Sequence, residues 1–144
     1  ALLAQGYASK GAAESRELVE CGRWDFDVFA PAGALRANIT DMAKYLRANL
    51  APDDTPLGRA MRFAQEPRYT ANPRLAIGLG WHLLTQTATG QPVTWHNGQT
   101  GGYHSMLAFD AARREGVVLL SNTNFDSDKI VLDFLAGLAS VSGG

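Results

Sequence analysis

The chain has 144 residues, of which 46% are apolar and 19% are charged, and its formal net charge at pH 7 is -1. This charge gives no electrostatic reason to expect nucleic acid or an anionic membrane as a partner, and no apolar stretch reaches the roughly 18 residues that a bilayer span needs. A chain of this length buries roughly two thirds of the surface that it exposes when unfolded. We therefore expect residues 1–144 to form a single domain with its own core and a small ligand.

The first 30 residues carry weak patterns. The segments "LLAQGYAS" (2–9) and "RWDFDVFA" (23–30) alternate like strands, whereas "AAESRELVE" (12–20) fits a short helix. On a strand, Asp25 and Asp27 would share one face. Two carboxylates so arranged indicate a solvated face more often than a catalytic pair, and we expect no acid–base site there.

Two consecutive helices are predicted next. In "PAGALRANITDMAKYLRANL" (31–50), Pro31 to Gly33 form a turn, and Thr40 is the expected N-cap. Apolar side chains then recur at helical spacing, namely Met42, Tyr45, Leu46 and Leu50. The segment "APDDTP" breaks this helix. Pro56 suits the first position of a second helix, which should end before Pro67.

The second half of the chain changes to a strand pattern. Turn-rich segments of hairpin length ("QTATGQ", "QTG" and "AARRE") separate four strand candidates: "RLAIGLGWHLLT" (74–85), "PVTWHNG" (92–98), "GYHSMLAFD" (102–110) and "GVVLLSNT" (116–123). This pattern predicts an antiparallel meander. Ser127 is the expected N-cap of a last helix, whose apolar stripe would cover the sheet with Ile130, Val131, Phe134, Leu135 and Leu138. Helices packed on an antiparallel sheet make the fold class α+β.

The stretch "WHNGQTGGYHSMLAFD" (95–110) places Gly98, Gly101 and Gly102 between two strand candidates. Glycine in a strand marks a bend, or a place where a ligand or another backbone lies close. A tight hairpin turn with glycines at positive φ explains the same residues, and the pattern leaves both interpretations open. A phosphate-binding loop is not expected, because such a loop joins a strand to a helix and carries a lysine that this segment lacks.

The three histidines of the chain are candidate metal ligands. His82, His96 and His104 have no carboxylate or thiolate at ligand spacing in the sequence. His82 also follows Trp81 within a strand candidate, where a core or interface role is more common. We therefore expect no metal and no cofactor.

The segment "WHNGQTGGYHSMLAFDAARREGVVLLSNTN" (95–124) resembles the third conserved box of the serine β-lactamase and penicillin-binding-protein superfamily. That box has a Lys/His-x-Gly triplet, a Thr-Gly-Gly turn, a strand, a charged turn and a strand ending in Asn-x-Asn. "PAGALRANITDMAKYLRANL" and "GLGWHLL" (78–84) are similar to segments that precede it in class C β-lactamases, D-alanyl-D-alanine carboxypeptidases and related esterases. The three matches occur in the family's order, and they imply the C-terminal portion of the β-lactamase/transpeptidase-like fold.

The resemblance also implies a mechanism. In these enzymes a serine attacks a carbonyl group to form an acyl-enzyme, while two backbone N–H groups stabilise the oxyanion. The second donor would be the N–H of Gln99. His96 takes the position of the family's lysine or histidine, which helps proton transfer or attracts a substrate carboxylate.

The same resemblance implies which residues contact the substrate, a small molecule or a peptide. The substrate would lie along this strand as an added edge strand, against Asn97, Gly98, Thr100 and Gly101. Asn122 and Asn124 match positions that sit near the substrate carboxylate in class C enzymes. A turn or capping role after the last strand explains these two asparagines equally well.

Two boxes of the family do not occur in the sequence. No serine is followed three residues later by lysine, and no tyrosine is followed two residues later by asparagine, so Ser-x-x-Lys and Tyr-x-Asn are missing. Both boxes lie upstream of the matched region in the family, and the chain begins at Ala1 without methionine. We therefore expect the C-terminal part of a larger domain: a fragment of a serine hydrolase that acts on a β-lactam, a D-Ala-D-Ala peptide or a small ester, and that is inactive by itself.

Two alternatives remain open. In the first, the chain is a non-catalytic binding module that kept the strand without the nucleophile. In the second, it is half of a complex in which a second polypeptide supplies the missing elements. A sheet without its partner strands exposes an edge, so we expect self-association. The resemblance also implies a periplasmic or secreted protein.

Overall fold

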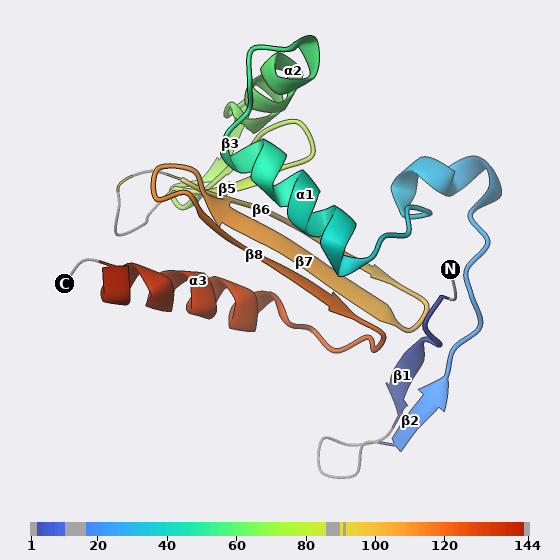
Figure 1. The fold of residues 1–144 in the computed structure, drawn as a ribbon. Coiled ribbons are helices and arrows are strands. Elements are labelled where there is room, and N and C mark those ends of the chain that lie inside the picture. The colour runs from blue at the N-terminus through green and yellow to red at the C-terminus, as the bar shows by residue number, and fades with distance from the viewer. Residues whose placement is uncertain (1–2, 11–16, 86–89, 91, 143–144) are drawn as a thin grey trace.

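The chain forms a six-stranded antiparallel sheet with helices on both faces, and a two-stranded hairpin lies beside one end of that sheet (Figure 1). The computed structural model describes residues 3–10, 17–85, 90 and 92–142, with side chains up to residue 137. The elements are β1 (Tyr7–Lys10), β2 (Glu17–Glu20), the 3-10 helix η1 (Asp27–Ala32), α1 (Ile39–Leu50), α2 (Pro56–Gln65), β3 (Tyr69–Asn72), β4 (Leu75–Ile77), β5 (His82–Leu84), β6 (Val93–Thr100), β7 (Tyr103–Asp110), β8 (Glu115–Ser121) and α3 (Asp128–Ser142). The turn predicted at "QTATGQ" falls largely outside the described residues.

The large sheet has the strand order β3-β4-β5-β6-β7-β8, so every strand pairs with its neighbour in sequence. This order confirms the predicted antiparallel meander and the α+β class. The strand expected over 74–85 is divided into β4 and β5, because the chain turns where Gly78 N–H donates to the carbonyl oxygen of Trp81 (2.8 Å). Gly80 lies within this turn at φ +72°, a value that favours glycine.

The core consists of two layers on opposite faces of the sheet. Strand β7 contributes to both, because successive side chains point to opposite faces. Leu107 and Phe109 pack with Leu46 of α1, while Met106 and Ala108 pack in the layer that contains Val131 and Leu135 of α3. β7 is therefore packed between α1 on one face of the sheet and α3 on the other.

The helices α1 and α2 begin where side chains cap them. The N-cap of α1 is Asn38 and not the predicted Thr40, because Asn38 Oδ1 accepts from Asp41 N–H at 2.9 Å. Thr40 lies inside the first turn instead. For α2 the prediction is confirmed: Pro56 is the first residue, Thr55 caps it, and the helix ends at Gln65, before Pro67.

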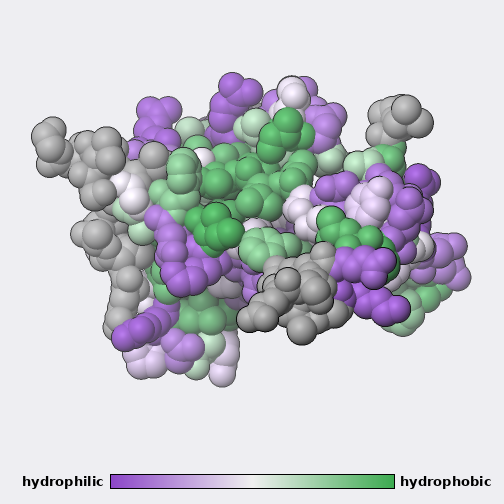
Figure 2. All heavy atoms as spheres, turned by 90° about the horizontal axis from the view of Figure 1, so that it is seen from below, coloured by the Kyte–Doolittle hydropathy of each residue, from purple (hydrophilic) through white to green (hydrophobic). Residues whose placement is uncertain are grey.

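Helix α3 covers the sheet with only part of its apolar stripe. Val131 and Leu135 are 1% exposed, whereas Ile130 and Phe134 are 54% and 58% exposed. Figure 2, viewed from the α3 side, shows hydrophobic side chains gathered over this helix. The wide buried stripe that was predicted is therefore half solvent-facing, and the side chain of Leu138 lies outside the described residues. None of the described helices combines the length and apolar character needed to cross a membrane.

The N-terminal part differs most from expectation. Glu17–Glu20 is a strand paired with β1 and not part of a helix, while residues 11–16 lie outside the described range. Residues 27–32 form a 3-10 helix and not a strand, so Asp25 and Asp27 do not share a strand face. Asp25 Oδ1 accepts the backbone N–H of Asp27 at 3.3 Å, which is a local turn contact.

Candidate active site

The second half of β6 has an open edge. Strand β5 pairs with β6 only from Val93 to Trp95, whereas β7 pairs with all of β6 from Val93 to Thr100. Among the described residues, His96–Thr100 therefore has a neighbouring strand on one side only. The backbone groups that point to the other side are available to a ligand.

The register of β6 and β7 indicates which groups those are. A two-residue turn joins the pair Thr100↔Tyr103, and the next pair is Gln99↔His104. In an antiparallel ladder hydrogen-bonded and non-hydrogen-bonded pairs alternate, and a two-residue hairpin is closed by a hydrogen-bonded pair. The backbone N–H and C=O of Gln99 therefore point toward the open edge. Those of Asn97 do the same, and the Asn97 carbonyl oxygen already lies 2.6 Å from His96 Nδ1.

A cavity of about 550 Å³ lies beside this edge, beneath α1 and α2. His96 lines it together with Tyr45 of α1, Trp81 and Ser105. The ring of Tyr45 stacks on that of Trp81, with centroids 6.4 Å apart and an interplanar angle of 15°. These side chains form an apolar wall next to the polar edge, which is a common composition of small-ligand sites.

Two histidines lie side by side at this edge. The rings of His82 and His96 are stacked with their centroids 5.4 Å apart. The ring of His82 also lies against that of Trp95, with centroids 4.4 Å apart. Burial lowers the pKa of His82 below its ordinary value of 6.5, His96 lowers it further, and Asp128 acts in the opposite direction. His82 Nδ1 is buried and forms no hydrogen bond within the described residues, so protonation of this nitrogen would bury an unpaired N–H.

The side chain of Asn97 is directed to the other side of the sheet, toward the start of α3. Its Nδ2 donates to Asp128 Oδ2. Asn97 pairs with Met106, whose side chain packs in the α3 layer, and this agrees with the alternation of a strand. Asn97 can therefore contact a ligand at the edge through its backbone, while its amide group links β6 to α3.

The three glycines of this stretch have different neighbours. A Cβ at Gly98 would lie 3.1 Å from Ser105 Oγ. At Gly101 a Cβ would lie 2.7 Å from the Trp24 ring, so this space is filled by the chain itself and gives no room to a ligand. Gly102 has φ +76° in the turn, and the backbone of Gly6 lies against it. The turn interpretation is therefore confirmed at Gly102, where another backbone also lies close, while a ligand beside Gly98 stays a prediction.

The two asparagines after β8 are engaged by the N-terminal segment. Asn122 Nδ2 donates to the carbonyl oxygen of Gln5 at 2.8 Å. Asn124 Oδ1 accepts from Ser9 N–H at 3.0 Å, and Asn124 N–H donates to the carbonyl oxygen of Tyr7 at 3.1 Å. These contacts tie β1 to the end of the large sheet, and they are long-range contacts instead of the local turn or capping role that was the alternative. A role of Asn122 and Asn124 near a substrate carboxylate stays a prediction.

A comparison with known protein families matches residues 2–140 to the Beta-lactamase family. The chain belongs to the Beta-lactamase family. A protein of Escherichia coli (strain K12) named Beta-lactamase is 26% identical over 128 aligned residues, which cover 67% of this chain and 34% of that protein. The chain thus spans about one third of the length of this curated relative.

Family resemblance drew attention to β6 in this Beta-lactamase-family chain but did not indicate what surrounds the strand. His96, Gln99 and Thr100 all lie on the open stretch of β6. Tyr45 and Ser105 line the cavity, yet in the sequence they look like an ordinary helix residue and an ordinary strand residue. Only the hydropathy break at Ser105 within an apolar strand could have drawn attention to it.

The lowered pKa of His82 predicts a pH dependence of stability. Because the folded pKa lies below the unfolded value of 6.5, the unfolded state binds more protons in that interval. We expect the free energy of unfolding to fall as the pH decreases from about 7 through 6.5 toward the lowered pKa. Urea titrations at several pH values, in buffer with a chelator, measure this slope. The variant His82→Gln should flatten it, and an unchanged slope would contradict the assignment.

Substitution of Gly102 should loosen the N-terminal segment of this Beta-lactamase-family chain. A Cβ at this position would lie 2.6 Å from the backbone of Gly6, and we expect Gly102→Ala to cost about 1–3 kcal/mol beyond the strain of positive φ. Gly80→Ala is the matched control, because Gly80 has φ +72° with open space around it. Urea unfolding and limited proteolysis after residue 10 compare the two variants. Equal losses would show that only the backbone angle matters.

Proposed function

We propose that this chain provides the substrate-binding strand of a serine hydrolase that acts through an acyl-enzyme on a β-lactam, a D-Ala-D-Ala peptide or a small ester. The observation that carries the proposal is the open edge of β6 at His96–Thr100, beside a cavity of about 550 Å³. A peptide-like substrate adds to such an edge through main-chain hydrogen bonds. Membership of the Beta-lactamase family supports the same chemistry.

The proposed reaction has two steps. A serine hydroxyl attacks the substrate carbonyl carbon, and negative charge develops on the carbonyl oxygen, to which Gln99 N–H donates a hydrogen bond. The tetrahedral intermediate then expels an amine or alcohol, which takes up the proton that the serine gave up. Water hydrolyses the ester that remains. His96 lies on the same open stretch and serves as a proton-transfer group.

We propose that the nucleophile comes from residues outside this chain. The 144 residues contain no Ser-x-x-Lys, and the chain spans only about one third of the Escherichia coli relative. On this assignment the chain contributes one oxyanion donor, His96 and the binding edge. By itself it binds substrate without turning it over.

Labelling with a serine-reactive fluorophosphonate tests this assignment. The 144-residue chain and the polypeptide that its native source produces are treated separately, and the intact mass of each is measured. We expect one adduct on a source polypeptide heavier than 15.5 kDa and none on the chain alone. Stoichiometric labelling of the chain alone would contradict the assignment of the nucleophile. An unlabelled source polypeptide would instead favour the non-catalytic binding module.

We further propose that the isolated chain self-associates. Among the described residues β8 pairs only with β7, and the neighbouring outer face of α3 exposes Ile130 and Phe134. An open strand edge next to an apolar surface favours association. Size-exclusion chromatography with light scattering should give a mass that rises with concentration, and Phe134→Lys should reduce this rise. A monomer at every concentration would refute the proposal.

The family also supports a proposal for the cellular location of the protein. We infer a periplasmic or secreted enzyme, because β-lactam and D-Ala-D-Ala substrates occur outside the cytoplasm. Fractionation of source cells, followed by detection of the polypeptide, tests this inference. Its recovery with the cytoplasmic fraction alone would contradict it.

A further inference from the structure

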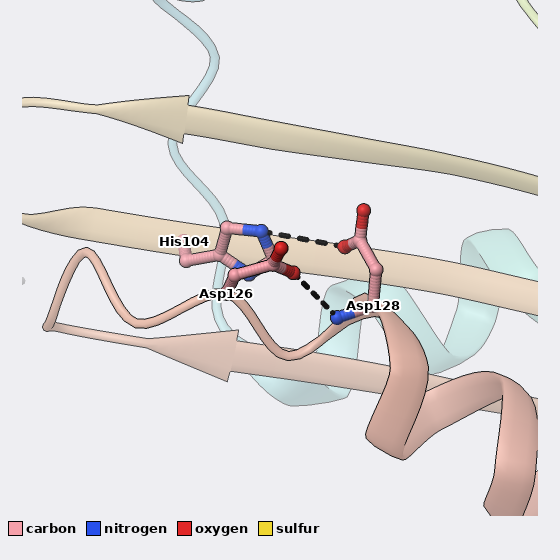
Figure 3. Close-up of side chains that lie close together, drawn as sticks. All are labelled: His104, Asp126 and Asp128. Atoms are coloured by element: carbon pink, nitrogen blue, oxygen red, sulfur yellow. Dashed lines mark hydrogen bonds and ion pairs between the residues drawn. The ribbon is translucent and has the colours of Figure 1, made fainter.

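Three ionisable side chains meet where β7 passes the start of α3 (Figure 3). His104, Asp126 and Asp128 can each place one ligand atom within 4.8 Å of the other two. The histidine comes from β7, and the two carboxylates flank Ser127 at the beginning of α3. The sequence showed no carboxylate near His104, but the fold supplies two of them from a distant segment.

The contact between His104 and Asp128 is the first step of the argument. His104 Nε2 lies 3.3 Å from Asp128 Oδ1, and the His104 side chain is only 2% exposed. Within the described residues, this Asp128 oxygen is buried and accepts no hydrogen bond. Since His104 Nε2 is the polar atom that faces this buried oxygen, either a proton on Nε2 or a bound cation must lie between the two atoms to offset the cost of burial.

The separation fits two ligands of one metal ion. Atoms about 2.0–2.1 Å from a tetrahedral zinc ion lie about 3.3–3.4 Å from each other. Asp126 is exposed, and its Oδ1 accepts Asp128 N–H at 3.0 Å. One of its carboxylate oxygens already lies within 4.8 Å of the ligand atoms of His104 and Asp128.

The second step concerns the groups that hold these ligands. Ser127 Oγ lies 2.9 Å from His104 Nδ1, so the serine can accept from Nδ1–H and leave the lone pair of Nε2 directed at Asp128. Asn97 donates to the other oxygen of Asp128. Hydrogen bonds of this kind orient the histidine and carboxylate ligands of metal sites.

We propose that His104, Asp126 and Asp128 bind a divalent transition metal ion such as Zn²⁺, with a fourth position for water. One imidazole with two carboxylates suits such an ion better than Mg²⁺ or Ca²⁺, which prefer oxygen ligands alone. The site lies on the α3 side of the sheet, and the cavity lies beneath α1 and α2. Metal binding therefore uses none of the groups that the proposed acyl transfer needs for chemistry, namely the serine, His96 and Gln99 N–H, although through Asn97 it joins the substrate-binding strand β6 to α3.

Isothermal titration of the chelator-treated 144-residue chain with zinc chloride tests the proposal. We expect one saturable site for Zn²⁺ and none for Mg²⁺ under the same conditions. Asp126→Asn and Asp128→Asn should each weaken binding about tenfold or more. The matched control is Asp133→Asn, because Asp133 is exposed on the same helix and pairs with Lys129. Its affinity for Zn²⁺ should equal that of the unsubstituted chain.

A second comparison separates this site from the other histidines. His82 and His96 are stacked and offer an alternative zinc site. Retention of binding in His96→Gln together with its loss in Asp126→Asn supports the proposal, and the reverse result overturns it. Since His104 is buried, the exposed Asp126 is the decisive position, and circular dichroism checks that each variant is folded. Absence of saturable Zn²⁺ binding also overturns the proposal and leaves His104 and Asp128 as an ordinary ion pair.

Discussion

Replacement of Phe109 by alanine is expected to lower the free energy of unfolding by about 3–5 kcal/mol. Phe109 has no exposed surface, and its ring meets Trp81 edge to face with centroids 5.5 Å apart. It lies on β7, in the core layer that also contains Leu46 of α1. Removal of the ring leaves a cavity between α1 and the sheet, and these elements would have to shift to fill it.

Urea unfolding followed by circular dichroism measures this loss. Phe134→Ala is the matched control, because it removes the same side chain from a position that is 58% exposed on α3. We expect this control to change stability by about 0.5 kcal/mol or less in a monomeric sample. If the two variants lost equal stability, the packing described for β7 and α1 would be wrong.

Replacement of Gln99 by proline is expected to lower kcat by about 100- to 1,000-fold in the active polypeptide that carries this segment. Proline lacks the backbone N–H that the proposed function assigns to the oxyanion. According to the register, this N–H points away from β7, so its removal breaks no bond between the two strands. KM should change much less than kcat, because the charge on the oxygen develops only in the transition state.

Gln99→Ala is the control for this prediction, since alanine keeps the N–H and loses only the side chain. Steady-state kinetics with a chromogenic β-lactam or ester measures both variants, and thermal unfolding verifies that each is folded. A similar loss of kcat in both variants would assign the effect to the side chain. That result would remove Gln99 N–H from the proposed mechanism.

The sequence was sufficient where local signals agree with the fold. Pro56 after Thr55 starts α2 because proline at the first helical position sacrifices no hydrogen bond. The meander of β6, β7 and β8 follows from apolar runs joined by short turns, since hairpins need only neighbouring residues. The motif that places His96 and Gln99 on β6 is also a local signal, because its residues are close together along a single strand.

The sequence was insufficient where a signal was weak or a position had competing candidates. Thr40 and Asn38 are both good N-cap residues, and only the backbone conformation selects Asn38. The residues of β2 carry a weak helical pattern, and pairing with β1 makes them a strand instead. The stripe of α3 is apolar on two sides, and the sequence does not say which side faces the sheet.

By itself, the sequence determined the fold class, the helices that carry strong capping and proline signals, and the strand that places His96 and Gln99 together, because these depend on residues close in the chain. Only the tertiary structure decided the partners of side chains from distant segments. Trp24 fills the space beside Gly101, and β1 engages Asn122 and Asn124. The start of α3 brings carboxylates to His104. Such contacts join segments far apart in the sequence, so no local pattern encodes them, and only packing of the whole chain brings them together.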